Sequence, residues 1–283
     1  MIPREVVSWL AQNRFGELVS QRPVSGGCIN NGMILRTASG RSFFLKLNAA
    51  PPVDMFAREV AGLEALRVSD GPSVPLPYLH GRTFLLMEDL APAARGVDYW
   101  VSFGHQLAAL HKYTNEQFGF GADNYIGSTP QPNPWTEDGF EFFTKQRLLF
   151  MACMARERGL LDRGDEARVA ALTARLPQLV PQQPPSLIHG DLWSGNALTT
   201  ADGSPAIIDP AAHYGWAEAE LAMTTLFGSF PSEFYRAYEE VRPLEPGYPS
   251  RYPIYNLYHL LNHLILFGRG YWGQVDAILR RYG

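Results

Sequence analysis

Alternating apolar and polar positions divide the first third of the chain into short strands and single helices. Apolar residues two to four positions apart near the N-terminus mark one face of a helix. The runs 33–36 and 42–47 flank a turn at Gly40 and predict two paired strands. A helix is predicted over 56–66 and a second strand pair over 78–87. This part of the chain is therefore expected to form a small antiparallel sheet with helices.

The rest of the chain mostly has the apolar spacing of helices. Such spacing covers 99–111, 138–159, 165–179, the region from 217 onward, and 255–267. Between the first two of these helices, residues 118–135 are rich in Gly, Pro, Asn and aromatic residues. A long loop of this kind in a compact domain is usually functional or a wall of a cleft.

Composition narrows the choice of partners and location. The 283 residues are 46% hydrophobic, enough for one large core or two lobes. With a net charge of −4 and no basic run, neither nucleic acid nor an anionic membrane surface is an expected partner. No apolar run has signal-peptide character or approaches the ~20 residues of a membrane span. The two cysteines cannot form a disulfide framework, so we expect a reducing cytoplasm.

The strongest chemical signal is the run His189-Gly-Asp191-Leu-Trp193-Ser-Gly-Asn196, followed by Asp209. This is the spacing of the kinase catalytic loop, H-x-D-x-x-x-x-N, and of the metal-binding Asp beyond it. Asp191 suits the base that faces an attacking hydroxyl. Asn196 and Asp209 suit Mg²⁺, which prefers hard oxygen ligands. Each residue alone is common in ordinary turns, but strand-like runs at 187–188 and 206–208 favour the kinase interpretation.

A second pair of residues fits nucleotide binding. Lys46 lies in a predicted strand and Glu59 in the helix that follows, the pair with which kinases hold the α- and β-phosphates. Glu64 is the alternative partner, although Glu59 is nearer the start of the helix. Upstream, Gly26 and Gly27 allow the backbone to approach phosphates closely, but their loop reads equally well as a hairpin turn.

The end of the last predicted strand is a candidate adenine site. In a two-lobed kinase the chain crosses between lobes here. Met87 would then line the back of the pocket, while Glu88 and Leu90 would supply backbone C=O and N–H groups. The alternative is a strand that simply ends in a loop.

Two further sets of polar residues have open interpretations. The carboxylates after Asp209, such as Glu220, either cap the helix predicted there or bind an amine or sugar hydroxyls. His259 and His263 are one helical turn apart, a spacing that binds transition metals. However, no Glu follows as H-E-x-x-H requires and no third ligand is evident, so a metal site there is not favoured.

Taken together, the sequence resembles the fructosamine (ketosamine-3-) kinase family over nearly its whole length. That family is related to the aminoglycoside and choline phosphotransferases, from which the loop version with Trp193 separates it. The runs that carry the resemblance include His189-Gly-Asp-Leu-Trp-Ser-Gly-Asn196, Asp209-Pro-Ala211, Asn124-Tyr-Ile-Gly127, Thr129-Pro-Gln131 and Gly26-Gly-Cys-Ile-Asn30.

The resemblance implies an enzyme that uses ATP and Mg²⁺ to phosphorylate a sugar hydroxyl of ketosamines. These substrates are ribulosamine or fructosamine adducts, free or protein-bound, and phosphorylation at the 3-position destabilises them, which implies deglycation. The implied fold is α+β and protein-kinase-like. It has a small antiparallel-sheet lobe for the nucleotide (1–88) and a larger, mainly helical catalytic and substrate-binding lobe (89–283). We expect a monomer or a weak homodimer.

The resemblance also assigns roles to single residues. Asp191 is the base, Asn196 and Asp209 hold Mg²⁺, and Lys46 with Glu59 positions the phosphates. Trp193 would stack on the sugar, with core packing as the alternative. The residues Tyr214 and Glu220 are expected on the substrate side.

Three positions set this chain apart or invite a separate hypothesis. Trp216 follows Tyr214-Gly215 where the family is expected to have a more polar turn, and Gly139 stands where the family often has an aromatic residue. Both bear on the sugar and amine pocket. Cys28 lies in the glycine loop, and if exposed it would be able to form an intermolecular disulfide that switches activity with redox state. A small packing residue is the alternative.

Two other functions compete with the first. One is a related small-molecule phosphotransferase acting on an aminoglycoside or a choline-like amino alcohol, against which Trp193 argues. The other is a non-catalytic, pseudokinase-like binding protein. Such a protein would be expected to have lost Lys46, Asp191 or Asp209, and all three are present.

Overall fold

The N-terminal part of the chain forms a five-stranded antiparallel sheet in the computed structural model, which describes residues 2–24 and 31–283. The strand order is β1-β2-β3-β5-β4. The strands are β1 (Leu18–Val24), β2 (Asn31–Thr37), β3 (Ser42–Leu47), β4 (Pro77–Gly81) and β5 (Phe84–Glu88), with helices α1 (Arg4–Gln12) and α2 (Met55–Leu66). The predicted strand pairs and both predicted helices are confirmed.

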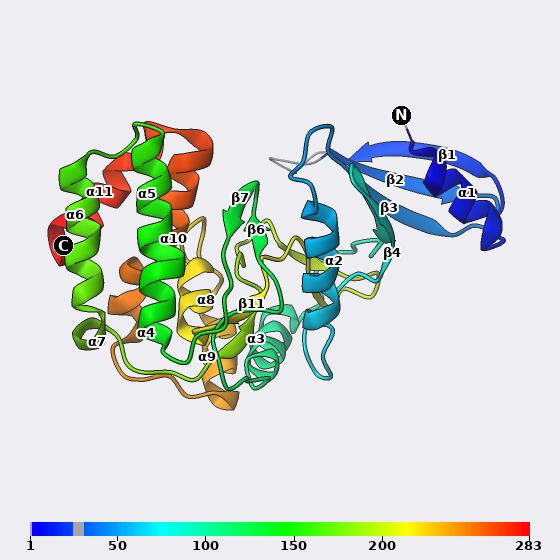
Figure 1. Ribbon diagram of the computed structural model, residues 1–283. Coiled ribbons are helices and arrows are strands. Elements are labelled where there is room, and N and C mark those ends of the chain that lie inside the picture. Colours follow the sequence, from blue (N-terminus) through cyan, green and yellow to red (C-terminus); the bar gives the residue numbers. More distant parts are fainter. Residues whose placement is uncertain (1, 25–30) are drawn as a thin grey trace.

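Alternation along β3 gives the sheet two different faces. Phe43 and Leu45 are buried with Val6 and Leu10 of α1 in a small core on one face. Lys46 therefore points to the opposite face, toward α2 and the rest of the molecule. Figure 1 shows this sheet with α1 on its outer side, and α2 between the sheet and the larger lobe.

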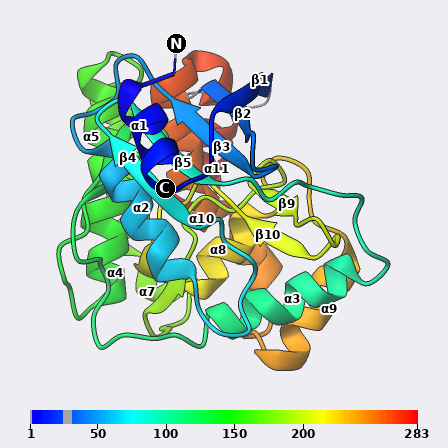
Figure 2. The same ribbon diagram turned by 90° about the vertical axis from the view of Figure 1, so that its right-hand side faces the viewer.

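The larger lobe is mainly helical (Figures 1 and 2). It contributes most of the main core, to which α2 and β5 of the smaller lobe also belong. Its α-helices are α3 (Tyr99–Leu110), α4 (Gly139–Phe142), α5 (Phe150–Glu157), α6 (Arg163–Ala174), α7 (Leu176–Leu179), α8 (Ala217–Met223), α9 (Ser232–Val241), α10 (Tyr248–Phe267) and α11 (Trp272–Tyr282). The π-helix η1 (Phe143–Leu149) joins α4 to α5, and the 3₁₀-helix η2 (Arg269–Tyr271) precedes α11. The prediction of helix over 138–159 is thus correct in extent, but its middle is wound as a π-helix. Within the described part of the chain, no helix combines the length and the apolar character needed to cross a membrane.

The larger lobe also contains three short two-stranded antiparallel sheets. They are β6 (Asn124–Ile126) with β7 (Thr129–Gln131), β8 (Ser186–Ile188) with β11 (His213–Gly215), and β9 (Ala197–Thr199) with β10 (Pro205–Ile207). The β6–β7 hairpin lies within the segment predicted as a cleft wall, and β6 contacts α2 (Figure 1). The predicted two-lobed α+β fold is confirmed. We continue to place the boundary between the lobes at Glu88, where β5 ends.

Candidate active site

A cavity of about 310 Å³ is lined by residues of both lobes. Its walls come from β2, β3 and α2 on one side and from the β6–β7 hairpin and the segment 191–211 on the other. It brings together six residues that the sequence analysis singled out: Lys46, Glu59, Asp191, Trp193, Asn196 and Asp209.

Lys46 makes two ion pairs at the edge of this cavity. Its Nζ donates to Oε1 of Glu59 at 2.7 Å and to Oδ1 of Asp209 at 2.9 Å. Glu59 is thus the partner, and the alternative Glu64 is exposed. Burial alone would lower the pKa of Lys46, but the carboxylates of Asp209 and Glu59 outweigh it and raise that pKa above its usual value. The lysine therefore stays a cation at any pH at which the protein works.

Asp191 lies in a tight loop that requires glycine before it. Gly190 has φ +82°, and a Cβ there would lie 2.2 Å from the carbonyl oxygen of Ala211. The Nδ2 of Asn196 donates to the backbone oxygen of Asp191 at 2.8 Å and so ties the two ends of the loop together. Burial, reinforced by the charge of Asp209, raises the pKa of Asp191 well above its usual value. A carboxylate with a raised pKa is a better proton acceptor.

Glu220 holds this loop from behind, which corrects its assignment to the substrate. Its side chain is 2% exposed and does not line the cavity. Its Oε1 accepts from the backbone N–H of Gly190 at 2.7 Å, and its Oε2 accepts from that of His189 at 2.9 Å. Helical spacing alone did not reveal that this carboxylate points inward to a backbone turn.

His111 completes the support of Glu220. Its Nε2 lies 2.9 Å from Oε2 of Glu220, and its Nδ1 lies 2.7 Å from the hydroxyl of Tyr238. Burial lowers the pKa of His111, so the ring is neutral and carries its proton on the nitrogen facing the carboxylate. Burial would raise the pKa of Glu220, but the hydrogen bonds from His111 and from the backbone N–H of His189 outweigh burial and lower it. Glu220 is therefore an anion in the folded protein.

The segment that carries Asp209 is held by the β6–β7 hairpin. Asp209 itself has φ +58°, an unusual conformation for a residue other than glycine. Asn124 Nδ2 donates to the carbonyl of Ala212 at 2.9 Å, and Gln131 Nε2 donates to that of Ala211 at 3.0 Å. Gln131 Nε2 also donates to Oδ1 of Asn124 at 2.7 Å. The two carboxamides thus form hydrogen bonds to the backbone two and three residues beyond Asp209.

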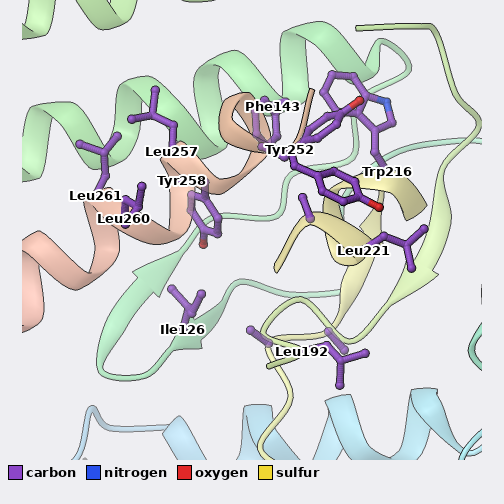
Figure 3. Packing of buried hydrophobic residues seen from close by; sticks show 14 of the residues in the cluster. Ile126, Phe143, Leu192, Trp216, Leu221, Tyr252, Leu257, Tyr258, Leu260 and Leu261 are labelled. Carbon is purple, nitrogen blue, oxygen red and sulfur yellow. The ribbon is translucent and has the colours of Figure 1, made fainter. Parts of the chain in front are cut away.

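This carboxamide pair is anchored in turn by the helical lobe. The hydroxyl of Tyr258 donates to Oε1 of Gln131 at 2.6 Å. Figure 3 shows Tyr258 reaching from α10 toward the hairpin that carries Ile126. On the other side Asn133 donates to Asn124, and the buried Arg147 donates to Asn133 at 2.7 Å. The sequence indicated a cleft wall here but not this network, because nothing in its spacing tells which backbone a carboxamide meets.

The residues present fit a magnesium ion. Because Asn196 Nδ2 is turned to Asp191 and Asp209 Oδ1 to Lys46, the oxygens Asn196 Oδ1 and Asp209 Oδ2 are the ligand atoms that remain. Mg²⁺ is usually bound by one or two protein oxygens together with phosphates and water. In the described part of the chain, no three His, Cys, Asp or Glu side chains form a metal cluster. His263 Nδ1 instead pairs with the backbone oxygen of His259.

Trp193 is both a wall of the cavity and part of the packing beneath it. It lines the cavity, and a Cβ on Gly195 would lie 2.4 Å from its ring. Its outer edge meets Phe227, with ring centroids 6.0 Å apart at 79°. The indole is thus held between Phe227 and Gly195 while it lines the cavity, and its stacking on a sugar stays a prediction.

Some expected residues do not line the cavity. Tyr214 is half-buried on β11 with its ring 6.1 Å from that of Trp135, so its assignment to the substrate is not supported by its position. Met87 is buried beside Phe44, and the N–H of Glu88 is donated to Leu76. The adenine-site assignments of Met87, Glu88 and Leu90 therefore stay predictions. The remaining three assignments, Gly26, Gly27 and Cys28, lie outside the described residues.

The two departures from the family pattern, Gly139 and Trp216, touch each other. A Cβ on Gly139 would lie 2.7 Å from Nε1 of Trp216 and 2.5 Å from the ring of Phe118. Trp216 is only 4% exposed and packs in the core near Phe143 (Figure 3). Its ring also contacts that of Tyr255. We expected both positions to shape the sugar pocket. The structure places them in the core behind the catalytic loop instead.

The chain is similar to known proteins over nearly its whole length. The family model described as fructosamine kinase matches residues 4–282. A probable ketoamine kinase of Synechocystis is 44% identical over 268 residues, covering 92% of this chain and 89% of that protein. A chloroplastic protein-ribulosamine 3-kinase of Oryza sativa subsp. indica is 38% identical over 284 residues, covering 96% and 81%. The crystal structure of a protein assigned as a fructosamine-3-kinase, from Thermobifida fusca, has a TM-score of 0.89 and 33% identity, covering 99% and 98%.

Proposed function

The chain belongs to the fructosamine kinase family, and from this premise we propose that it transfers the terminal phosphate of ATP to a sugar hydroxyl of a ketosamine. The acceptors proposed are ribulosamine and fructosamine adducts, free or protein-bound. One observation carries the proposal. One cavity, also lined by Trp193, is faced by a cation, a base and two oxygen ligands: Lys46, Asp191, and Asn196 with Asp209.

Asp191 is the residue proposed to act on the acceptor. The sugar hydroxyl becomes a nucleophile as its proton passes to the Asp191 carboxylate, which burial makes a better proton acceptor. The loop 189–191 fixes this carboxylate because Glu220 binds its backbone. A rigidly held base stays in the orientation that the reaction needs. Such positioning, together with electrostatic stabilisation, is the main contribution that a protein makes to phosphoryl transfer.

Lys46 and the two oxygen ligands are proposed to handle the phosphates. Lys46 carries a permanent positive charge and is oriented by Glu59, as expected of a residue that binds α- and β-phosphate oxygens. When bound, Mg²⁺ would neutralise negative charge on the phosphates, held by Asn196 Oδ1 and Asp209 Oδ2. The backbone beyond Asp209 is fixed by the hairpin, so this ligand keeps its place in the cleft.

Deglycation follows chemically if the 3-hydroxyl is the acceptor. Enolisation of the phosphorylated ketosamine toward C1 expels phosphate from C3, and the resulting imine hydrolyses to release the amine. We propose this sequence as the outcome of the reaction, with only the phosphoryl transfer taking place on the protein.

ATP consumption with Mg²⁺ and a panel of ribuloselysine, fructoselysine, kanamycin and choline tests the proposal. Turnover with the ketosamines is expected. Turnover only with kanamycin or choline would leave the catalytic residues in place but reject the substrate class. No turnover with any of the four, despite ATP binding, would reject the proposal and favour a binding protein.

The Asp191→Asn variant tests the base. It removes the proton acceptor with little change in shape, and kcat should fall by ~10²–10⁴ while nucleotide affinity changes little. Isothermal titration with ATP separates the two effects. Near-normal turnover by this variant would contradict the role of Asp191.

A further inference from the structure

Arg58 lies on the rim of the cavity and is linked to the larger lobe through Asp54. It precedes Glu59 on α2, and its Nε donates to Oδ2 of Asp54 at 2.7 Å. The other oxygen of Asp54 accepts from the hydroxyl of Tyr125 at 2.7 Å, and Tyr125 belongs to β6 of the larger lobe. Arg58 and Tyr125 both line the cavity that contains Asp191 (α2 and β6 in Figure 1). A chain of three side chains thus crosses from one lobe to the other at the active site.

The described wall of the cavity carries more carboxylates than cations, and Arg58 is one of its two cations. Lys46 already faces two carboxylates, Glu59 and Asp209, and Asp191 adds a third. Along the described part of the cavity wall, Arg58 is the only cation besides Lys46. Its hydrogen bond to Asp54 uses Nε, which leaves the two terminal nitrogens of its guanidinium for other acceptors. A planar guanidinium with two such groups matches the geometry of phosphate oxygens.

We propose that Arg58 binds the phosphate group being transferred, and that Asp54 and Tyr125 are positioning residues that orient it. The inference rests on the proposed function. The transferred group passes from a nucleotide held by the sheet lobe to an acceptor held by the helical lobe. Arg58 belongs to the sheet lobe, lines the cavity between them and is linked through Asp54 to Tyr125 of the helical lobe. Negative charge on this group develops between the lobes during transfer, where a fixed cation stabilises it most.

The neighbours of Arg58 are suited to holding it. Burial and the hydrogen bond to Asp54 raise the pKa of Tyr125 to about 12, so its hydroxyl remains a donor. The hydrogen bonds of Tyr125 and Arg58 lower the pKa of Asp54, which remains an anion. At neutral pH, the hydroxyl of Tyr125 and the carboxylate of Asp54 therefore keep the protonation states that their hydrogen bond requires.

The test compares nucleotides that differ in the terminal phosphate. Mg²⁺ with ADP and Mg²⁺ with the non-hydrolysable analogue adenylyl imidodiphosphate are titrated calorimetrically into wild type, Arg58→Gln and Arg67→Gln. Arg67 follows α2, is exposed and does not line the cavity, so it is the matched control. Arg58→Gln should weaken the analogue about tenfold and ADP less than about twofold, the weight of one charge-assisted contact partly open to water.

The outcomes separate this inference from the proposed function. Suppose that wild type binds both nucleotides. If Arg58→Gln then weakened the affinity for both equally, or for neither, the role of Arg58 would be overturned and the proposed function would stand. Wild-type protein that binds neither nucleotide would instead reject the proposed function. A change confined to the KM of the sugar acceptor would assign Arg58 to the acceptor and also overturn the inference.

Kinetics of graded variants test the orientation. Arg58→Gln should lower kcat by about 10²-fold, and Arg58→Lys should restore part of it, because a cation returns without the planar fork. Tyr125→Phe keeps the ring and the fold but frees Asp54, and it should lower kcat about threefold with the KM for ATP almost unchanged. If Tyr125→Phe raised only the KM for ATP, or left kcat at the wild-type value, the positioning role would be wrong.

Discussion

Two loops of the active site are supported by groups of opposite chemical character. The loop 189–191, with the proposed base Asp191, is held by the charged carboxylate of Glu220. The segment 209–212, with the proposed metal ligand Asp209, rests on the neutral carboxamides of Asn124 and Gln131. All three supporting side chains are buried and come from outside the loops that they hold.

The difference follows from what each loop presents. The catalytic loop turns backbone N–H groups inward, and a carboxylate can accept several of them at once. The Asp209 segment turns backbone carbonyls inward, which need donors, and a carboxamide supplies two N–H groups without bringing a charge into the core. A buried carboxylate gives stronger bonds, but it costs more to desolvate and depends on pH. The predictions below test whether this contrast is real.

The largest effect is expected from Glu220→Ala. The change leaves two buried N–H groups and His111 without their acceptor, so the free energy of unfolding should fall by about 3–5 kcal/mol. Because Asp191 loses its fixed position, kcat should fall about 10²-fold in the protein that remains folded. Urea unfolding and steady-state kinetics measure both. A variant as active as wild type would show that the loop holds itself.

Gln131→Ala should have a smaller effect and a different signature. It removes donors to Ala211 and Asn124 and the acceptor of Tyr258, so the free energy of unfolding should fall by about 2–3 kcal/mol. Since the backbone beyond Asp209 loosens, the Mg²⁺ concentration for half-maximal activity should rise several-fold, with activity recovered at saturating Mg²⁺. The exposed Gln178→Ala is the control. An unchanged Mg²⁺ requirement would separate the hairpin from the metal ligand.

The smallest effect is a difference in pH dependence. The pKa of Glu220 is lowered from the usual 4.5 in the folded protein, so its stabilising contribution is present above pH 4.5 and is lost as pH falls through the folded value. Below pH 4.5, wild type should therefore lose stability more steeply than Glu220→Gln, by at most about 1.4 kcal/mol per pH unit. Gln131→Ala should run parallel to wild type, since the groups bonded to the Gln131 side chain, Asn124, Ala211 and Tyr258, include no carboxylate. If the free energy of unfolding of wild type and of Glu220→Gln depended on pH in the same way, the proposed difference between charged and neutral loop supports would be wrong.

The same contrast shows what the sequence could and could not predict. Spacing along a strand, a helix and a loop was enough to expect Lys46 beside Glu59 and to group Asp191 with Asn196 and Asp209, because these relations depend on local structure. The supports depend on packing. Whether a carboxylate on a helix faces substrate or backbone is decided by elements far along the chain, and so the role of Glu220 was missed.

The carboxamides of the hairpin escaped prediction for a related reason. Asn124 and Gln131 bind backbone carbonyls 88 and 80 residues away. A carbonyl has the same chemistry in every residue, so the sequence holds no mark of the partner. The loop was expected to border the cleft, and Asn124, Tyr125 and Gly127 do line the cavity.

The contact between Gly139 and Trp216 limits the order in which this protein can change. Any side chain at 139 would collide with the indole of Trp216 and with Phe118, and an indole at 216 needs the space that a glycine leaves. Exchanging only one of these residues would leave the core overpacked or with a cavity. Either change typically lowers the free energy of unfolding by about 1–3 kcal/mol. The two positions should therefore evolve as a unit, and grafting either from a relative calls for the other.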